Sequence, residues 1–107
     1  MNFSDLQERL RRFADERHWA PYHSPKNLAM ALAVEAAELL EHFQWLSEHE
    51  SATVSEHARE EIAEEVADIQ IYLAILAGKL GIDIDAAVDA KIERNARKYP
   101  PGTVGFR

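Results

Sequence analysis

Two pairs of carboxylates stand at helical spacing within otherwise apolar sequence. Glu35 and Glu38 lie three residues apart in LAMALAVEAAELL, and every other residue of that stretch is apolar. Glu65 and Asp68 repeat the spacing in EEVADIQIYL. Residues three apart share one face of an α-helix, so each pair would present both of its carboxylates to the same side.

Carboxylates that converge need a cation between them. Two carboxylates about 5 Å apart repel by roughly 3 kcal/mol at an effective dielectric constant of about 20. Four of them would balance two divalent ions, and a site made only of oxygen ligands favours Mg²⁺ or Mn²⁺. The spacing therefore predicts a metal site, and the bound ions would in turn accept phosphate.

Two other interpretations of the acidic residues are open. Solvated surface is the usual place for acidic side chains, and it suits Glu56, Glu60 and Glu64. It suits the two pairs less well, because their sequence neighbours on both sides are apolar. A di-iron helical bundle is disfavoured, since it needs histidine three residues after glutamate and no histidine in this chain has that neighbour.

The formal net charge of −7 disfavours a nucleic-acid partner and poses a problem for any phosphate-bearing ligand. The stretch KIERNARKYP supplies cations, with Lys91, Asn95 and Lys98 on one helix face and Arg94 beside them. Basic residues also complement the dipole at the end of a helix. That explanation serves Arg97 and Lys98 equally well, but Lys91 lies too far from the helix end for it.

Ring-bearing side chains gather at expected helix ends and in the connection between the first two helices. They are Trp19, Tyr22, His23 and Trp45. Rings in such places usually anchor packing, but they can also stack against a flat base. Covalent catalysis has no support, because the chain has no cysteine, no G-x-S-x-G and no Gly-rich phosphate loop.

Capping motifs and helical periodicity predict the elements that position these residues. Capping boxes open the first and third helices, with Ser4 paired to Gln7 and Thr53 paired to Glu56. The connection after the first helix is expected to be extended, and the polar stretch SEHESATVS is expected to be a loop. The four predicted helices span about residues 4–19, 24–46, 53–79 and 83–99.

Single residues mark the other helix ends. Ser24 is a predicted N-cap with Pro25 at the first helical position, where its fixed φ fits. Gly81 is expected to end the third helix in a left-handed conformation, and Asp83 caps the fourth. Pro100 stops the fourth helix, because the residue before a proline is pushed out of the α region.

The absence of alternating apolar and polar runs makes the predicted fold class all-α, most simply a four-helix bundle. The length of 107 residues suits one domain over residues 1–107, with an irregular tail from about residue 100. The chain has neither cysteine nor the ~18 uninterrupted apolar residues of a membrane span. We therefore expect a cytoplasmic protein without a membrane partner.

The second predicted helix is apolar on more than one side. Leu28, Leu32, Leu39 and Phe43 form one stripe, yet the remaining sides are also mostly Ala, Met, Val and Leu. A chain of 107 residues can hardly cover a helix on several sides by itself. The pattern therefore indicates a subunit interface and a homo-oligomer.

The chain resembles the MazG-like nucleotide pyrophosphohydrolases, particularly their dCTP pyrophosphatase-like branch. Three stretches carry the likeness, in order: RHWAPYHSPKNLAMALAVEAAELLEHFQW, EEIAEEVADIQIYL and KIERNARKYP. It covers about residues 13–100 and includes E-x-x-E, FQW, E-x-x-D-x-x-x-Y and K-x-x-x-N-x-x-x-Y-P at suitable separations. Two departures are Ala36-Ala37 in place of a more usual Val-Gly, and His42 where Leu is often found.

The resemblance implies an all-α, Mg²⁺-dependent hydrolase that converts a nucleoside triphosphate to the monophosphate and pyrophosphate. It also implies a homotetramer built as a dimer of dimers. Carried onto this chain, it implies Glu35, Glu38, Glu65 and Asp68 as metal ligands, Tyr72, Lys91, Asn95 and Tyr99 as contacts to phosphate or sugar, and Trp19, His23 and Trp45 as the base pocket.

Our hypothesis is that Mg²⁺ activates a water for attack on the α-phosphorus, while Glu38 or Glu41 accepts the proton and pyrophosphate leaves. The resemblance favours dCTP or a modified dCTP as substrate, in house-cleaning of the nucleotide pool. Two alternatives stay open. One is the same chemistry on dUTP or phosphoribosyl-ATP, and the other is a non-catalytic helical oligomer that binds nucleotide.

Overall fold

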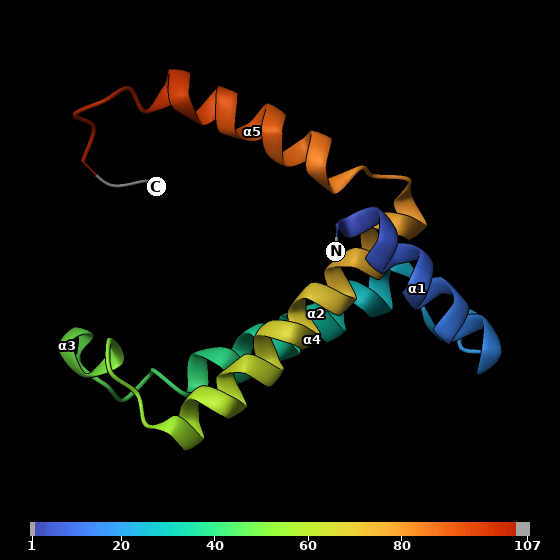
Figure 1. The fold of residues 1–107 in the computed structure, drawn as a ribbon, viewed down its shortest axis with the longest axis horizontal. Coiled ribbons are helices and arrows are strands. Elements are labelled where there is room, and N and C mark those ends of the chain that lie inside the picture. Colours follow the sequence, from blue (N-terminus) through green and yellow to red (C-terminus); the bar gives the residue numbers. More distant parts are fainter. Residues whose placement is uncertain (1, 105–107) are drawn as a thin grey trace.

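Helices make up the computed structural model, which describes residues 2–104 (Figure 1). The end of the predicted irregular tail, residues 105–107, lies outside the described residues. No strand occurs between residues 2 and 104, so the predicted all-α class is confirmed. In chain order the elements are α1 (Phe3–Glu16), the 3₁₀ helix η1 (Ala20–Tyr22), α2 (Pro25–Glu41), α3 (Glu48–Ser51), α4 (Glu56–Leu80) and α5 (Ile84–Lys98).

The paired helices α2 and α4 form the centre of the fold, and α1 packs against α4 (Figure 1). The side-chain amide of Gln7 on α1 donates a hydrogen bond to the carbonyl of Ala74 on α4, at 3.2 Å. The fully buried hydrophobic residues in the described part of the chain are mostly small: Ala14 on α1, Ala74 and Ala77 on α4, and the larger Leu28 on α2. The most extensive helix packing is that of α2 against α4.

α5 extends away from the other helices, so the described part of the chain is open on one side (Figure 1). The radius of gyration is 16.8 Å, whereas a compact domain of this length has about 13 Å. The accessible surface is 8372 Å², whereas a folded monomer of this mass exposes about 6,100 Å². The fourth predicted helix therefore exists, but it does not close a bundle within one chain.

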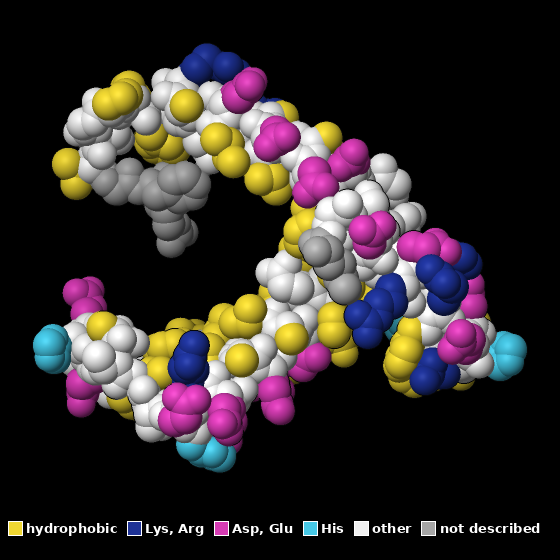
Figure 2. Space-filling view, in the orientation of Figure 1, with side chains coloured by type: hydrophobic (Ala, Val, Ile, Leu, Met, Phe, Trp, Pro, Cys, Tyr) yellow, Lys and Arg dark blue, Asp and Glu magenta, His cyan; other side chains and the backbone are white. Residues whose placement is uncertain are grey.

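Apolar side chains remain exposed on both sides of this opening. Figure 2 shows hydrophobic side chains facing the hollow from α5 and from the α2 and α4 pair. On α5, Val88 and Ile92 are 48% and 60% exposed. On α2, the side chains of Met30, Val34 and Leu40 are each more than half exposed. No helix among the described residues is both long and apolar enough to cross a membrane.

Several predicted helix ends are confirmed. Ser24 and Asp83 each accept a hydrogen bond from the backbone N–H three residues on, both at 3.1 Å, and so cap α2 and α5. Gly81 ends α4 with a φ of 67°, in the left-handed region where glycine carries no steric penalty. α5 ends at Lys98, before Pro100.

The predicted capping box at the first helix is wrong. α1 begins at Phe3, and Asn2 is its cap, with Oδ1 accepting a hydrogen bond from the Asp5 N–H at 2.8 Å. Ser4 therefore lies inside the helix, and Gln7 reaches α4 instead. Asn and Ser are about equally good caps, so their ranking could not decide between two positions so close in sequence.

The predicted cap of the third helix is also wrong. Ser55 rather than Thr53 caps α4, since its hydroxyl accepts a hydrogen bond from the Ala58 N–H at 3.1 Å. A complete capping box does occur in the stretch predicted to be a loop. There Ser47 and Glu50 open the short helix α3, with reciprocal hydrogen bonds of 3.1 and 2.9 Å.

Two other predicted boundaries are too long. α2 ends at Glu41, and the residues from there to the predicted end at Leu46 form turns. α1 ends at Glu16 rather than near Trp19. The connection that follows is not fully extended, because it contains η1, with a proline in the first turn.

We predict that Ser55→Ala lowers the free energy of unfolding by about 1 kcal/mol, because it leaves the Ala58 N–H without its side-chain acceptor. Thr53→Ala is the matched control, since it removes a hydroxyl outside α4 and should cost less than ~0.5 kcal/mol. Urea unfolding followed by circular dichroism measures both. Equal losses in the two variants would mean that the cap of α4 is wrongly assigned.

Candidate functional site

The facing sides of α2 and α4 bring the four predicted carboxylates together. Glu35 and Glu38 are half-buried on α2, and Glu65 and Asp68 are half-buried on α4. The two helices make the most extensive packing contact in the described chain. The Glu35 carboxyl lies close enough to the other three for their charges to act on it.

The surroundings of Glu35 raise the pKa of its carboxyl above the usual value. Burial is the largest cause, and the negative charge of Glu38 comes next. The charge of Asp68, a hydrogen bond with Glu38 and the charge of Glu65 add to the effect. All of these disfavour the ionised form, so a cation at this position would relieve the opposition among the acids.

Two carboxylate oxygens of this group are buried and have no hydrogen-bond partner among the described residues. They are Oε2 of Glu35 and Oε2 of Glu65. Buried polar atoms are normally bonded, and unpartnered carboxylate oxygens are the donors that Mg²⁺ and Mn²⁺ prefer. Between residues 2 and 104 no three His, Asp or Glu side chains already stand where they could hold one ion. The chemistry of the donors fits such an ion, but the carboxylates would have to move closer together to hold it.

His42, at the C-terminal end of α2, also reaches the acidic group, and the sequence reasoning missed it. Its Nε2 lies 2.5 Å from Oε2 of Glu65, and its Nδ1 lies 4.0 Å from Oε2 of Glu61. The short contact is not aligned as a hydrogen bond, so Oε2 of Glu65 still lacks a hydrogen-bond partner. A signal existed in the sequence, because Glu35, Glu38 and His42 stand at i, i+3 and i+7 on one helix face.

The two candidate proton acceptors differ in their surroundings. Glu38 is half-buried and interacts with Glu35 inside the acidic group. Glu41 is exposed and is the last residue of α2. Glu38 is therefore closer to any chemistry at the carboxylates.

A cavity of about 400 Å³ lies between α1 and α4 and reaches the acidic group at Asp68. Tyr72 lines it from α4, while Trp19 and His23 line it from the segment between α1 and α2. Its volume falls within the range of small-molecule pockets. The rest of its lining is mostly apolar: Leu6, Arg9, Leu10, Phe13, Ala14, Ile71 and Ile75.

The end of α1 sets the position of the Trp19 ring. His18 has a φ of 57°, in the left-handed region that few side chains other than glycine adopt. The turn lets the backbone N–H of Trp19 donate a hydrogen bond to the Ala14 carbonyl, at 2.9 Å. The indole then meets Phe13 edge to face, with ring centroids 5.5 Å apart, and lies 6.3 Å from the His23 ring.

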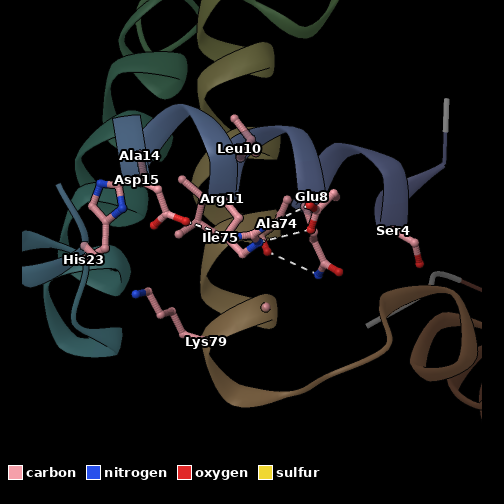
Figure 3. A pocket seen from close by; sticks show the side chains of 13 residues that line it. Ser4, Glu8, Leu10, Arg11, Ala14, Asp15, His23, Ala74, Ile75 and Lys79 are labelled. Carbon is pink, nitrogen blue, oxygen red and sulfur yellow. Dashed lines mark hydrogen bonds and ion pairs between the residues drawn. The ribbon is translucent and has the colours of Figure 1, made fainter. Parts of the chain in front are cut away.

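A second cavity, of about 330 Å³, follows another face of α1 (Figure 3). Figure 3 shows Arg11 and Asp15 on α1, with Lys79 on α4 and His23 at one end. Burial lowers the pKa of His23, and the charge of Lys79 lowers it further, which favours the neutral ring. None of the four predicted metal ligands lines this cavity, so the cavity at Asp68 is the better candidate site.

The three predicted base-pocket residues do not meet within one chain. Trp19 and His23 precede the N-terminal end of α2, whereas Trp45 follows its C-terminal end and is 87% exposed. The 17 residues of α2 span about 25 Å. Only Trp19 and His23 therefore share the cavity.

The predicted phosphate and sugar contacts are also divided. Tyr72 lines the cavity at Asp68. Lys91 and Asn95 belong to α5, and Tyr99 follows as its C-cap. Because α5 extends away from the α2 and α4 pair (Figure 1), these three residues lie apart from the carboxylates within one chain.

Known proteins with related sequences are MazG-like proteins and dCTP pyrophosphatases. The MazG-like family matches residues 30–103. The dCTP pyrophosphatase 1 of Bos taurus is 41% identical over 98 residues, and that of Homo sapiens is 40% identical. Each match covers 90% of this chain and 58% of the relative. The chain thus spans little more than half the length of these curated relatives.

A solved structure agrees in both fold and sequence. The crystal structure of a pyrophosphatase from Archaeoglobus fulgidus superposes with a TM-score of 0.84 at 47% sequence identity, over 91% of each chain. The family match extends across more than half of the residues, including both pairs of carboxylates. The chain therefore belongs to the MazG-like family.

Proposed function

We propose that this chain hydrolyses a nucleoside triphosphate to the monophosphate and pyrophosphate, in a reaction that depends on a divalent cation. The observation that carries the proposal is the pair of buried carboxylate oxygens of Glu35 and Glu65 that accept no hydrogen bond, together with a ligand-sized cavity that opens at Asp68. The similarity to dCTP pyrophosphatases and to a solved pyrophosphatase supports the same class of reaction.

The four carboxylates on α2 and α4 hold Mg²⁺, with Mn²⁺ as a substitute. When bound, the cation activates water and neutralises charge on the triphosphate. Glu38 accepts the proton of the water that attacks the α-phosphorus, since it is half-buried beside Glu35, whereas Glu41 is exposed. Pyrophosphate is the leaving group.

The cavity at Asp68 takes the nucleoside. Trp19 offers the flat face that base stacking needs, and the lowered pKa of His23 keeps its ring uncharged beside the base. Tyr72 lines the same cavity, one helical turn after Asp68 on α4, and contacts the sugar or phosphate. Among nucleotides, dCTP is the substrate that the names of the relatives favour, and a modified dCTP is the related candidate.

We further propose that the working form is a homo-oligomer, a dimer of dimers. The chain exposes 8372 Å², about 2,000 Å² beyond the expectation for its mass, and a standard interface needs only about 800 Å² per partner. A second copy covers the apolar residues of α2 and α5. It also brings Lys91, Asn95 and Tyr99 to the carboxylates of its neighbour, and Trp45 to the neighbour's base pocket.

Pyrophosphate release by the purified chain tests the proposed reaction. The panel contains dCTP, modified dCTPs, dUTP, the other deoxynucleoside triphosphates and phosphoribosyl-ATP, each with Mg²⁺ or with EDTA. We expect release only with Mg²⁺, and the highest kcat/KM for dCTP or a modified dCTP. A higher kcat/KM for dUTP or phosphoribosyl-ATP would change the assigned substrate but leave the proposed reaction unchanged. Nucleotide binding without release would support a non-catalytic oligomer.

Glu38→Gln should lower kcat by about 10²-fold or more, because it removes both a cation ligand and the proton acceptor. Glu60→Gln is the matched control, since Glu60 is an exposed glutamate on α4 outside the acidic group. Both variants should keep the helix content of the wild-type chain. A Glu38→Gln variant with wild-type turnover would contradict the role of Glu38.

Glu35→Gln should have opposite effects on stability with and without Mg²⁺. The folded-state pKa of the Glu35 carboxyl is raised, so its ionisation destabilises the folded protein as pH rises through that pKa. The uncharged amide of Glu35→Gln should therefore raise the Tm in EDTA at neutral pH. In the wild type, Mg²⁺ at about 100 times its Kd adds about 2.7 kcal/mol, or roughly 10 °C in Tm. The variant should gain much less.

Differential scanning calorimetry in EDTA and in Mg²⁺ makes this comparison. The matched control is again Glu60→Gln, which should respond to Mg²⁺ as the wild type does. If Mg²⁺ left the wild-type Tm unchanged, or stabilised Glu35→Gln equally, Glu35 would not be a cation ligand.

Ile92→Glu should dissociate the oligomer, because Ile92 is 60% exposed on the apolar face of α5 that a second copy covers. Light scattering after gel filtration should give a multiple of the chain mass for the wild type and a smaller particle for the variant. Glu93→Lys, at the adjacent exposed position, is the control for a charge change alone. A monomeric wild type, or a variant of unchanged size, would rule out this interface.

A further inference from the structure

We propose that His42 is a positioning residue for the cation site, which holds the Glu65 carboxylate in place and thereby sets the affinity for divalent cations. The inference rests on the proposed function, because it takes Glu65 as a cation ligand. His42 comes from the end of α2 and Glu65 from the middle of α4, so the contact also links the two helices that carry the acids.

The contact is close and largely shielded from water. Nε2 of His42 lies 2.5 Å from Oε2 of Glu65, and the two side chains are only 18% and 17% exposed. Nitrogen and oxygen lone pairs repel at this distance, so we assign the proton of the ring to Nε2. The N–H of the ring therefore faces the carboxylate and restrains Glu65. Because the contact is not aligned as a hydrogen bond, the lone pairs of Oε2 stay available to a cation.

The other ring nitrogen faces a second acidic residue. Nδ1 of His42 lies 4.0 Å from Oε2 of Glu61, one helical turn before Glu65 on α4. Glu61 also contacts the exposed His57 at 3.0 Å. The ring of His42 is therefore set between two glutamates, one inside the acidic group and one at its margin.

Residues that orient a metal ligand without touching the metal have a known energetic scale. Their replacement typically weakens metal binding by about 10- to 100-fold. The replacement weakens the binding of every cation that uses the oriented ligand, because the ligand is no longer held in position. Direct ligation by a ring nitrogen differs, since it favours Co²⁺ or Ni²⁺ over Mg²⁺.

Cation binding to the full chain, stripped of metal and without nucleotide, tests the proposal. Mn²⁺ binding is titrated by electron paramagnetic resonance, and Mg²⁺ and Co²⁺ are measured by competition. We expect His42→Ala to weaken all three ions by about 10- to 100-fold. His42→Gln should recover part of the affinity, because its amide N–H can still reach Glu65.

His57→Ala is the matched control, since His57 also contacts Glu61 but is 82% exposed. It should bind the three ions as the wild type does. Circular dichroism and Tm verify that α2 and α4 stay folded in each variant. If His42→Ala does not fold, His42→Asn replaces it, because the shorter side chain cannot reach Glu65.

Three results would overturn the role of His42. They are wild-type affinity in His42→Ala, an equal loss in His57→Ala, and a loss for Co²⁺ alone, which would make His42 a ligand instead. A wild-type chain that binds none of these ions overturns the proposed function together with this inference. A chain that binds Mg²⁺ and releases pyrophosphate, but does not respond to His42→Ala, overturns the inference alone.

Discussion

Repulsion between half-buried carboxylates on α2 and α4 is the constraint on which the rest of the site depends. The extensive packing of α2 against α4 holds the two helices together, and that packing keeps the acids close although their charges oppose it. The pKa of Glu35 is raised first by burial and then by the negative charges of the other acids, so it reports both effects. Under the proposed function a divalent cation would remove this repulsion, so the carboxylates that destabilise the chain by opposing one another would be the groups that bind the cation.

The open shape of the chain separates the carboxylates from the cationic residues of α5. The acidic group and the cavity at Asp68 lie on α1, α2, α4 and the segment around Trp19, whereas Lys91 and Asn95 lie on α5. Exposed apolar residues on α5 and α2 would supply the hydrophobic surface for the proposed oligomer.

The helices and most of their ends could be predicted from sequence, although the caps of α1 and α4 and the short helix α3 were not. The parts of the structure that depend on another helix could not be predicted. The i, i+3 spacing placed each carboxylate pair on one face, and Ser24 and Asp83 marked true helix starts. His42 was missed because its partner, Glu65, is on α4. The residue spacing within one helix does not indicate which residues of another helix it will face. The direction of α5 was missed because few contacts with the other helices fix it, and helix periodicity alone does not indicate direction.

Anomalous diffraction from crystals grown with Mn²⁺ tests the central claim most directly, since it locates the cation without reference to activity. The account predicts an anomalous peak between α2 and α4, bounded by the carboxylates of Glu35, Glu38, Glu65 and Asp68, with Oε2 of both Glu35 and Glu65 turned toward it. Mn²⁺ bound elsewhere, with these four carboxylates free of any ion, would contradict the account.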